Sequence, residues 1–140
     1  MAPTFLNHFF YEFVTLIVIL DPVATVPIFL MVTAGLPRRQ ALLVAAYAVG
    51  VAFLIMLFFI LVGRPLLSAL HIPMASFQLA GSLILLLFGL KMVLGKVTEE
   101  AASLPADATP LQRAVFPLAV PGIAGAGAIL TVVLLTDNTV

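Results

Sequence analysis

The chain has 140 residues, of which 64% are hydrophobic and 9% are charged, and its formal net charge is zero. Soluble domains are about 45–50% apolar and roughly 25% charged, so a compact soluble fold of this size could not bury so much apolar surface. The charge balance argues against a nucleic-acid partner, and the absence of cysteine excludes disulfide scaffolds, zinc fingers and thiol catalysis. The composition is that of a membrane protein.

Two stretches in the middle of the chain read as regular membrane-spanning helices. A span needs about 20 consecutive apolar residues, because the hydrocarbon core is roughly 30 Å thick. Residues 41–63 contain no charged residue, and residues 73–95 contain only Lys91, which lies about one turn from the end of the stretch. We predict that Lys91 extends to the membrane interface rather than serving as a counter-ion for Asp21.

The first and fourth membrane segments are predicted to be broken. The first, about residues 9–33, contains Asp21 followed by proline in its middle, and the fourth, in residues 114–140, contains two prolines and three glycines. These residues interrupt a helix, whereas the apolar length of both stretches is typical of a span. The sequence therefore predicts an all-α fold, a polytopic transmembrane helix bundle with four membrane segments.

The positions of the basic residues predict the orientation. Cytoplasmic loops of membrane proteins carry an excess of Lys and Arg. Arg38 and Arg39 follow the first segment, Lys96 and Arg113 follow the third, and the N-terminal tail has no basic residue. We expect the N-terminus outside, the first helix retained, and residues 96–113 as a polar, solvated and partly flexible cytoplasmic connector.

The break in the first segment carries the most informative chemistry. Asp is a favoured N-cap and Pro is favoured at the first helical position, so Asp21 and Pro22 form a helix start signal halfway along the span. Pro22 and Pro27 each free a backbone carbonyl, which must then be buried in protein or line a wet cavity. Asp21 and the backbone around Thr25 either form part of an ion or substrate site, or Asp21 only caps the second half-helix.

The fourth segment has a similar interruption at Pro121, Gly122, Gly125 and Gly127. Placing Pro121 on Pro22 aligns PVATVPIF with PGIAGAGA. Interruptions at matching places in two halves of a chain indicate an inverted-repeat transporter site. The alternative is that the glycines only permit close helix packing.

The remaining polar residues give weaker signals. Gln78 and Ser82 in the third segment either bond to another helix or line a cavity. His8 and His71 lie near segment ends without metal-binding partners, and the chain contains neither G-x-S-x-G nor H-E-x-x-H. We therefore predict no enzymatic activity, no cofactor and no metal.

Three ordered motifs resemble a known family. The stretches DPVATVPIFLMVTAG, FQLAGSLILLLFGLKMV and VFPLAVPGIAGAGAILTVV are similar to the signature stretches of the MarC family. These are multi-pass membrane proteins of bacteria and archaea, also grouped as small neutral amino acid transporters. The resemblance implies a plasma (inner) membrane location and six helices in two inverted halves. Residues 1–95 would form the first three-helix repeat and residues 114–140 the first helix of the second.

This chain departs from the family pattern at the second break. The family motif usually reads G-P-G-A-I, whereas residues 125–129 here read GAGAI, with Ala126 in place of the proline. In the third segment an A-G-G pattern is replaced by Ala80, Gly81 and Ser82. In the repeat alignment given above, the family proline would have matched Pro27.

The leading hypothesis is a secondary transporter that moves a small neutral solute, such as an amino acid, between the two broken segments. Its partners would be the lipid bilayer and the solute; coupling to a proton or cation and self-association into a homo-oligomer are left open. The alternatives are a non-transporting membrane subunit and an inactive truncated fragment of the transporter. The candidate solute-binding residues are Asp21, Pro22, Thr25, Pro27, Gln78, Pro121, Gly122, Gly125 and Gly127.

Overall fold

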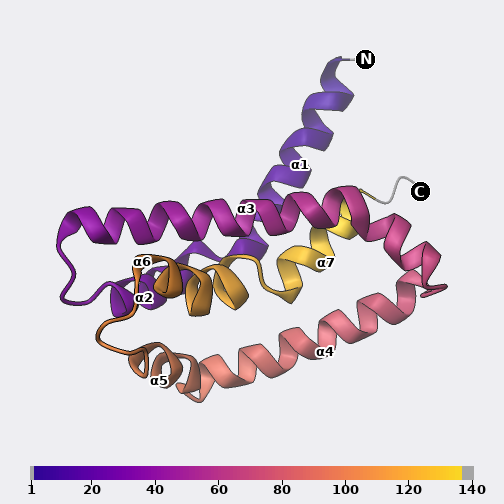
Figure 1. Cartoon of the computed structure of the whole chain (residues 1–140). Coiled ribbons are helices and arrows are strands. Elements are labelled where there is room, and N and C mark those ends of the chain that lie inside the picture. The colour runs from indigo at the N-terminus through magenta and orange to yellow at the C-terminus, as the bar shows by residue number, and fades with distance from the viewer. Residues whose placement is uncertain (1, 137–140) are drawn as a thin grey trace.

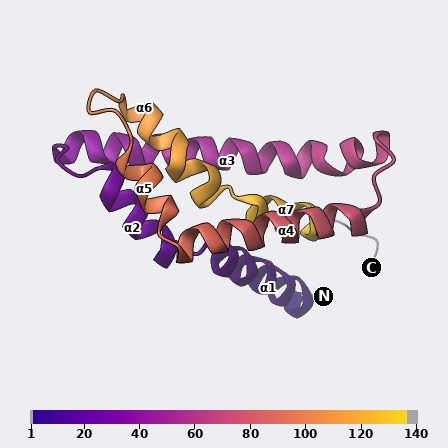
Figure 2. The same ribbon diagram turned by 90° about the horizontal axis from the view of Figure 1, so that it is seen from below.

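The computed structural model describes residues 2–136, and this part of the chain is helical without a strand. Figure 1 shows α3 and α4 running antiparallel across the molecule, with α7 between them and α1 projecting away from the other helices. Figure 2, seen from below, shows α2, α5 and α6 gathered at one end of α3. The elements are α1 (Ala2–Leu20), α2 (Pro22–Val32), α3 (Arg38–Ala69), α4 (Met74–Val93), α5 (Lys96–Ala102), α6 (Pro110–Arg113), η1 (Ala114–Ile123) and α7 (Ala126–Leu135).

The helix lengths fit the predicted membrane segments. By length and apolar composition, α3 and α4 can each cross a membrane, and α1 with α2 forms a third candidate span that is bent by 41° at its break. The fourth segment consists of the irregular η1 and the short apolar α7. The structure therefore confirms a polytopic helical bundle in which the first and fourth segments are broken.

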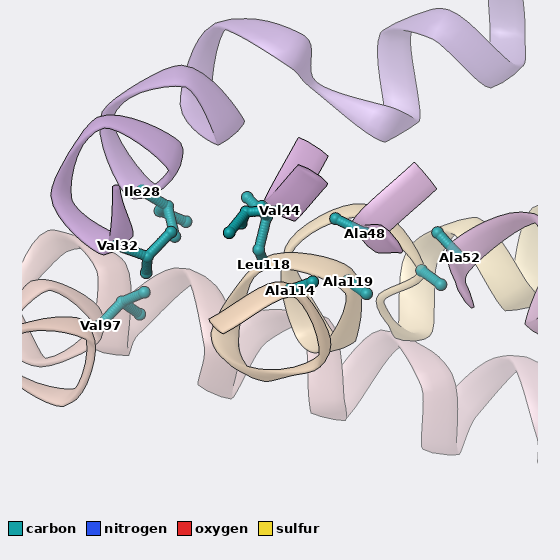
Figure 3. Close-up of a cluster of buried hydrophobic side chains, with 10 residues drawn as sticks. Ile28, Val32, Val44, Ala48, Ala52, Val97, Ala114, Leu118 and Ala119 are labelled. Atoms are coloured by element: carbon teal, nitrogen blue, oxygen red, sulfur yellow. The ribbon is translucent and has the colours of Figure 1, made fainter. Parts of the chain in front are cut away.

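A cluster of buried hydrophobic side chains lies where α2, α3, α5 and η1 meet (Figure 3). Val44, Ala48 and Ala52 recur every fourth residue on α3 and are fully or almost fully buried, so they form a narrow face of one valine and two alanines. Leu118 and Ala119 of η1 pack against this face. Small side chains let helix backbones approach closely, and the van der Waals packing that results is one of the forces that associate helices in lipid.

The stretch 96–113, predicted as a polar, solvated and partly flexible connector, is more ordered than that. It contains α5 and α6, and Val97 of α5 is 3% exposed and belongs to the hydrophobic core. Thr109 and Gln112 form a capping box at the start of α6, with each side chain bonding to the backbone of the other residue. This stretch is therefore a packed helical connector, because it has both an apolar contact residue and its own helix cap.

Two basic residues, Lys91 before this connector and Arg113 at its end, have different environments. Lys91 at the end of α4 forms an exposed salt bridge of 2.9 Å with Glu100 of α5, and it does not pair with Asp21. Arg113, which we had counted as a charge of a solvated loop, is only 9% exposed. That expectation is corrected because the Arg113 guanidinium bonds to backbone carbonyls inside the fold.

Candidate functional site

The first break lies at Asp21, between α1 and α2. Asp21 adopts a left-handed backbone conformation (φ 42°, ψ 68°), which Asp tolerates better than most residues. Its Oδ1 atom accepts a hydrogen bond of 3.2 Å from the backbone N–H of Ala24, so Asp21 caps α2. The carbonyl oxygen of Asp21 accepts bonds from both the N–H and the hydroxyl of Thr25 at 3.1 Å. The predicted helix start is therefore present, and Asp21 is its N-cap.

The second break separates η1 from α7. Phe116 and Val120 have extended backbone dihedrals inside η1, so this segment is not a continuous α-helix. Gly125 is the N-cap of α7 with φ −77° and ψ 174°, and it has no side chain that could bond to the amides of the first turn. The amides at the start of a helix have no intrahelical partners, so α7 presents unpaired donors at its N-terminus.

The two breaks border one cavity of about 230 Å³. Asp21 and Thr25 line it from the first break, and the second break contributes three of the predicted glycines, Gly122, Gly125 and Gly127. The cavity thus has a carboxylate and a hydroxyl on one wall and a helix N-terminus on another. The third wall is α4, which contributes Ile84, Leu85, Phe88, Gly89 and Met92.

The glycines also permit close helix contacts. A Cβ atom on Gly127 would lie 2.8 Å from Leu85 Cδ2 and 3.4 Å from Ile19 Cγ2, so α7 approaches both α4 and α1 at this point. A Cβ atom on Gly81 would lie 3.2 Å from Leu130 Cδ2. Gly127 therefore has two roles, because it lines the cavity and permits close helix packing. Gly81 permits close packing but does not line this cavity.

A comparison with protein families agrees with this architecture. The model of the MarC family, described as integral membrane proteins, matches residues 6–140. The chain belongs to the MarC family.

Curated relatives of this MarC family chain are described as UPF0056 membrane proteins. It is 32% identical to one from Aquifex aeolicus (91% of this chain and 61% of the relative are covered) and 34% identical to one from Methanocaldococcus jannaschii (89% and 62%). The inner membrane protein YhgN of Escherichia coli K12 is 32% identical, with 95% and 66% covered. The chain thus spans less than two thirds of the length of these relatives. No solved structure matches it.

Not all of the predicted residues of this MarC family chain line the cavity between the breaks. Pro22 borders a second, almost wholly apolar cavity of about 340 Å³ between α2, α3 and η1, which Thr25 also lines. Pro27 lies inside α2 and is exposed. The side chain of Pro121, in η1, is outside the part of the chain that the structure describes. Gln78 is exposed on α4, and its carbonyl accepts a bond of 2.7 Å from Ser82, so Ser82 bonds within its own helix.

Sequence reasoning named Gln78 as the site residue of α4 and missed the α4 residues that line this cavity. Leu85 and Phe88 are apolar side chains on an apolar helix, and such residues look the same whether they face lipid, a neighbouring helix or a cavity. Gly89 is the one α4 residue of this wall that stands out in the sequence. Glycine destabilises the interior of a helix relative to alanine, so its presence there indicates a special role.

Proposed function

We propose that this MarC family chain carries the solute site of a secondary transporter for small neutral solutes such as amino acids. The observation that supports the proposal is the meeting of two helix breaks, far apart in sequence, at a single cavity. Half-helix ends that point at a central site are the usual solute-binding arrangement in transporters built from inverted repeats. We propose the plasma (inner) membrane as its location, with the N-terminus outside.

The chemistry of the cavity suits a small zwitterion. The Asp21 carboxylate can accept hydrogen bonds from an ammonium group, since within residues 2–136 only its Oδ1 atom has a hydrogen-bond partner. The uncapped N-terminus of α7 can donate to a carboxylate, which the positive end of the helix dipole favours. A cavity of about 230 Å³ is smaller than the roughly 300–1,000 Å³ typical of sites for drug-sized ligands, so it favours a small solute.

The same carboxylate gives a route for coupling. A proton or a cation that binds Asp21 would neutralise its charge and change its attraction for the ammonium group of the solute. We therefore propose that solute movement is coupled to a proton or cation at Asp21.

Uptake into proteoliposomes tests the proposal. Labelled alanine or glycine is added to vesicles containing the wild-type chain, an Asp21→Asn variant, a Glu12→Gln variant, or no protein. Asn is as good an N-cap as Asp, so Asp21→Asn removes the charge while leaving the start of α2 intact. Glu12 is an exposed acidic residue of α1 outside the cavity, so Glu12→Gln is the matched control.

We expect uptake above that of empty vesicles for the wild type and Glu12→Gln, and a large loss for Asp21→Asn. Equal signals in all four preparations would refute the transport proposal. That result would favour a non-transporting membrane subunit, in which the close contacts of Gly81 and Gly127 serve helix assembly alone.

A further inference from the structure

Arg113 is a buried cation whose partners are all backbone carbonyls. Its Nη1 atom donates to the carbonyl of Val32 at 2.9 Å and its Nε atom to that of Ala108 at 3.1 Å. Its Nη2 atom donates to the carbonyls of Ala106 at 3.2 Å and Pro105 at 3.4 Å. Within residues 2–136 no carboxylate pairs with this guanidinium. Burying a charge without an opposite charge is costly, and these bonds offset that cost only while the segments that supply the carbonyls keep this arrangement.

The bond to Val32 joins two parts of the chain that are 81 residues apart. Val32 is the last residue of α2, and the carbonyls at a helix C-terminus carry partial negative charge that attracts a cation. Arg113 immediately precedes η1. Its side chain therefore ties the C-terminal end of α2, which follows the first break, to the start of the segment that leads to the second break.

The two ends of α2 are packed very differently. On the face of α2 that packs inward, Ile28 and Val32 toward the C-terminal end are 3% and 0% exposed, whereas Ala24 and Thr25 toward the N-terminal end are half-buried and border the cavity. The cavity between the breaks lies on one side of α2 and the apolar cavity of about 340 Å³ lies on another, and Thr25 lines both. Space is thus available beside the half of α2 that carries Asp21 and Thr25, and α2 is held mainly at its other end.

We propose that Arg113 is a positioning residue that sets the place of Asp21 and Thr25 by anchoring the far end of α2. A helix of 11 residues is roughly 16 Å long, so a tilt of about 10° at the Val32 end would move Asp21 by roughly 3 Å. A displacement of roughly 3 Å at Asp21 would change which protein groups face a solute that contains only a few atoms. The effect on solute binding rests on the proposed function, but the anchoring of α2 does not.

Distances between spin labels test the anchor directly. The chain has no cysteine, so introduced cysteines can be labelled without background. One pair, Val23→Cys with Leu86→Cys, reports the distance from α2 to α4, and both positions are exposed. A reference pair, Leu54→Cys with Leu86→Cys, reports the distance from α3 to α4. Both pairs are measured in lipid nanodiscs by double electron–electron resonance.

Each pair is placed in the wild type, Arg113→Met, Arg113→Lys and the control Arg39→Met, which removes an exposed arginine near the start of α3. We expect Arg113→Met to broaden the α2–α4 distances and shift their mean by about 2 Å, because the label at position 23 is nearer to Val32 than Asp21 is and moves less for the same tilt. Arg113→Lys should show a smaller change in the same direction, because one ammonium cannot reproduce the planar array of guanidinium donors. The α3–α4 pair and the Arg39→Met chain should match the wild type.

Unchanged α2–α4 distances in both Arg113 variants would overturn the proposal, and so would equal broadening of both pairs, which indicates general loss of structure. If Arg113→Met does not fold, the α2–α4 and α3–α4 distances in Arg113→Lys test the anchoring of α2 in the same way. In proteoliposomes the Arg113→Lys chain should show a raised apparent KM for alanine with little change in Vmax. Should no chain transport alanine, the label distances still decide whether Arg113 anchors α2.

Discussion

A proline should be tolerated at position 126, the first residue of α7. Proline requires extended backbone in the residue before it, and Gly125 has φ −77° and ψ 174°. Proline also lacks an N–H group, but the first helical residue has no intrahelical acceptor for one. The fixed φ of proline, about −65°, is close to the helical value. The substitution Ala126→Pro therefore removes no helix hydrogen bond.

The expected effect is a small gain in stability. A proline that fits the native backbone typically stabilises a protein by about 0.4–1 kcal/mol, because it restricts the unfolded chain. Ala126 lines the cavity between the breaks, so the added ring atoms have free space beside them. The control Ile129→Pro removes the bond of 3.0 Å from the Ile129 N–H to the Gly125 carbonyl. It should cost about 3 kcal/mol or more, as prolines inside helices do.

The free energy of unfolding can be measured by titration with sodium dodecyl sulfate, followed by far-ultraviolet circular dichroism. Ala126→Pro should unfold at the wild-type midpoint or above it, and Ile129→Pro well below it. A loss of more than about 1 kcal/mol in Ala126→Pro would refute the assignment of residue 126 as the start of α7, because a proline at that position costs no hydrogen bond.

Two further predictions concern glycines and use the same titration. Gly127→Ala should lower the free energy of unfolding by about 1 kcal/mol, because the Cβ atom of the new alanine would meet the flexible end of Leu85 at 2.8 Å. Adding Leu85→Ala should remove this clash, so the double variant should lose less than the sum of the two single variants. Additive losses would contradict the contact. Gly122→Ala should cost more, about 2–3 kcal/mol, because its Cβ would lie 2.9 Å from the backbone carbonyl of Pro117, which cannot rotate away. The matched control Gly50→Ala meets no atom within 4 Å and should be neutral or slightly stabilising, so a comparable loss in both variants would refute the clash.

The breaks could be predicted because local chemistry determines them. An Asp side chain caps the helix that follows it, and a proline fits the first turn, so Asp21 and Pro22 define the start of α2 whatever surrounds them. The capping box of Thr109 and Gln112 is equally local, but the polar composition of residues 96–113 favoured a solvated, partly flexible connector. A charge count cannot predict that Arg113 is buried, because its partners are carbonyls from distant segments.

The α4 residues that line the cavity could not be predicted for a different reason. The face of a soluble helix is identified by its contrast between apolar and polar residues. In α4 almost every side chain is apolar, and lipid accepts an apolar surface as readily as a neighbouring helix does. Which of its residues border the cavity depends on where α7 packs, and Gly81 and Gly127 allow that close approach.

The structure also changes how the two breaks correspond. The prediction paired Pro22 with Pro121, but matching the two helix starts pairs Asp21 with Gly125 and Pro22 with Ala126, which moves the register by five residues. The proline of the usual G-P-G-A-I motif would then stand at position 126, the helical position that Pro22 holds in α2. The breaks thus share a helix-start geometry and differ in the cap: one presents a carboxylate, and the other presents unpaired amides. For the zwitterionic solute proposed above, opposite polarity on two walls of one cavity would be favourable, and two identical breaks would not supply it.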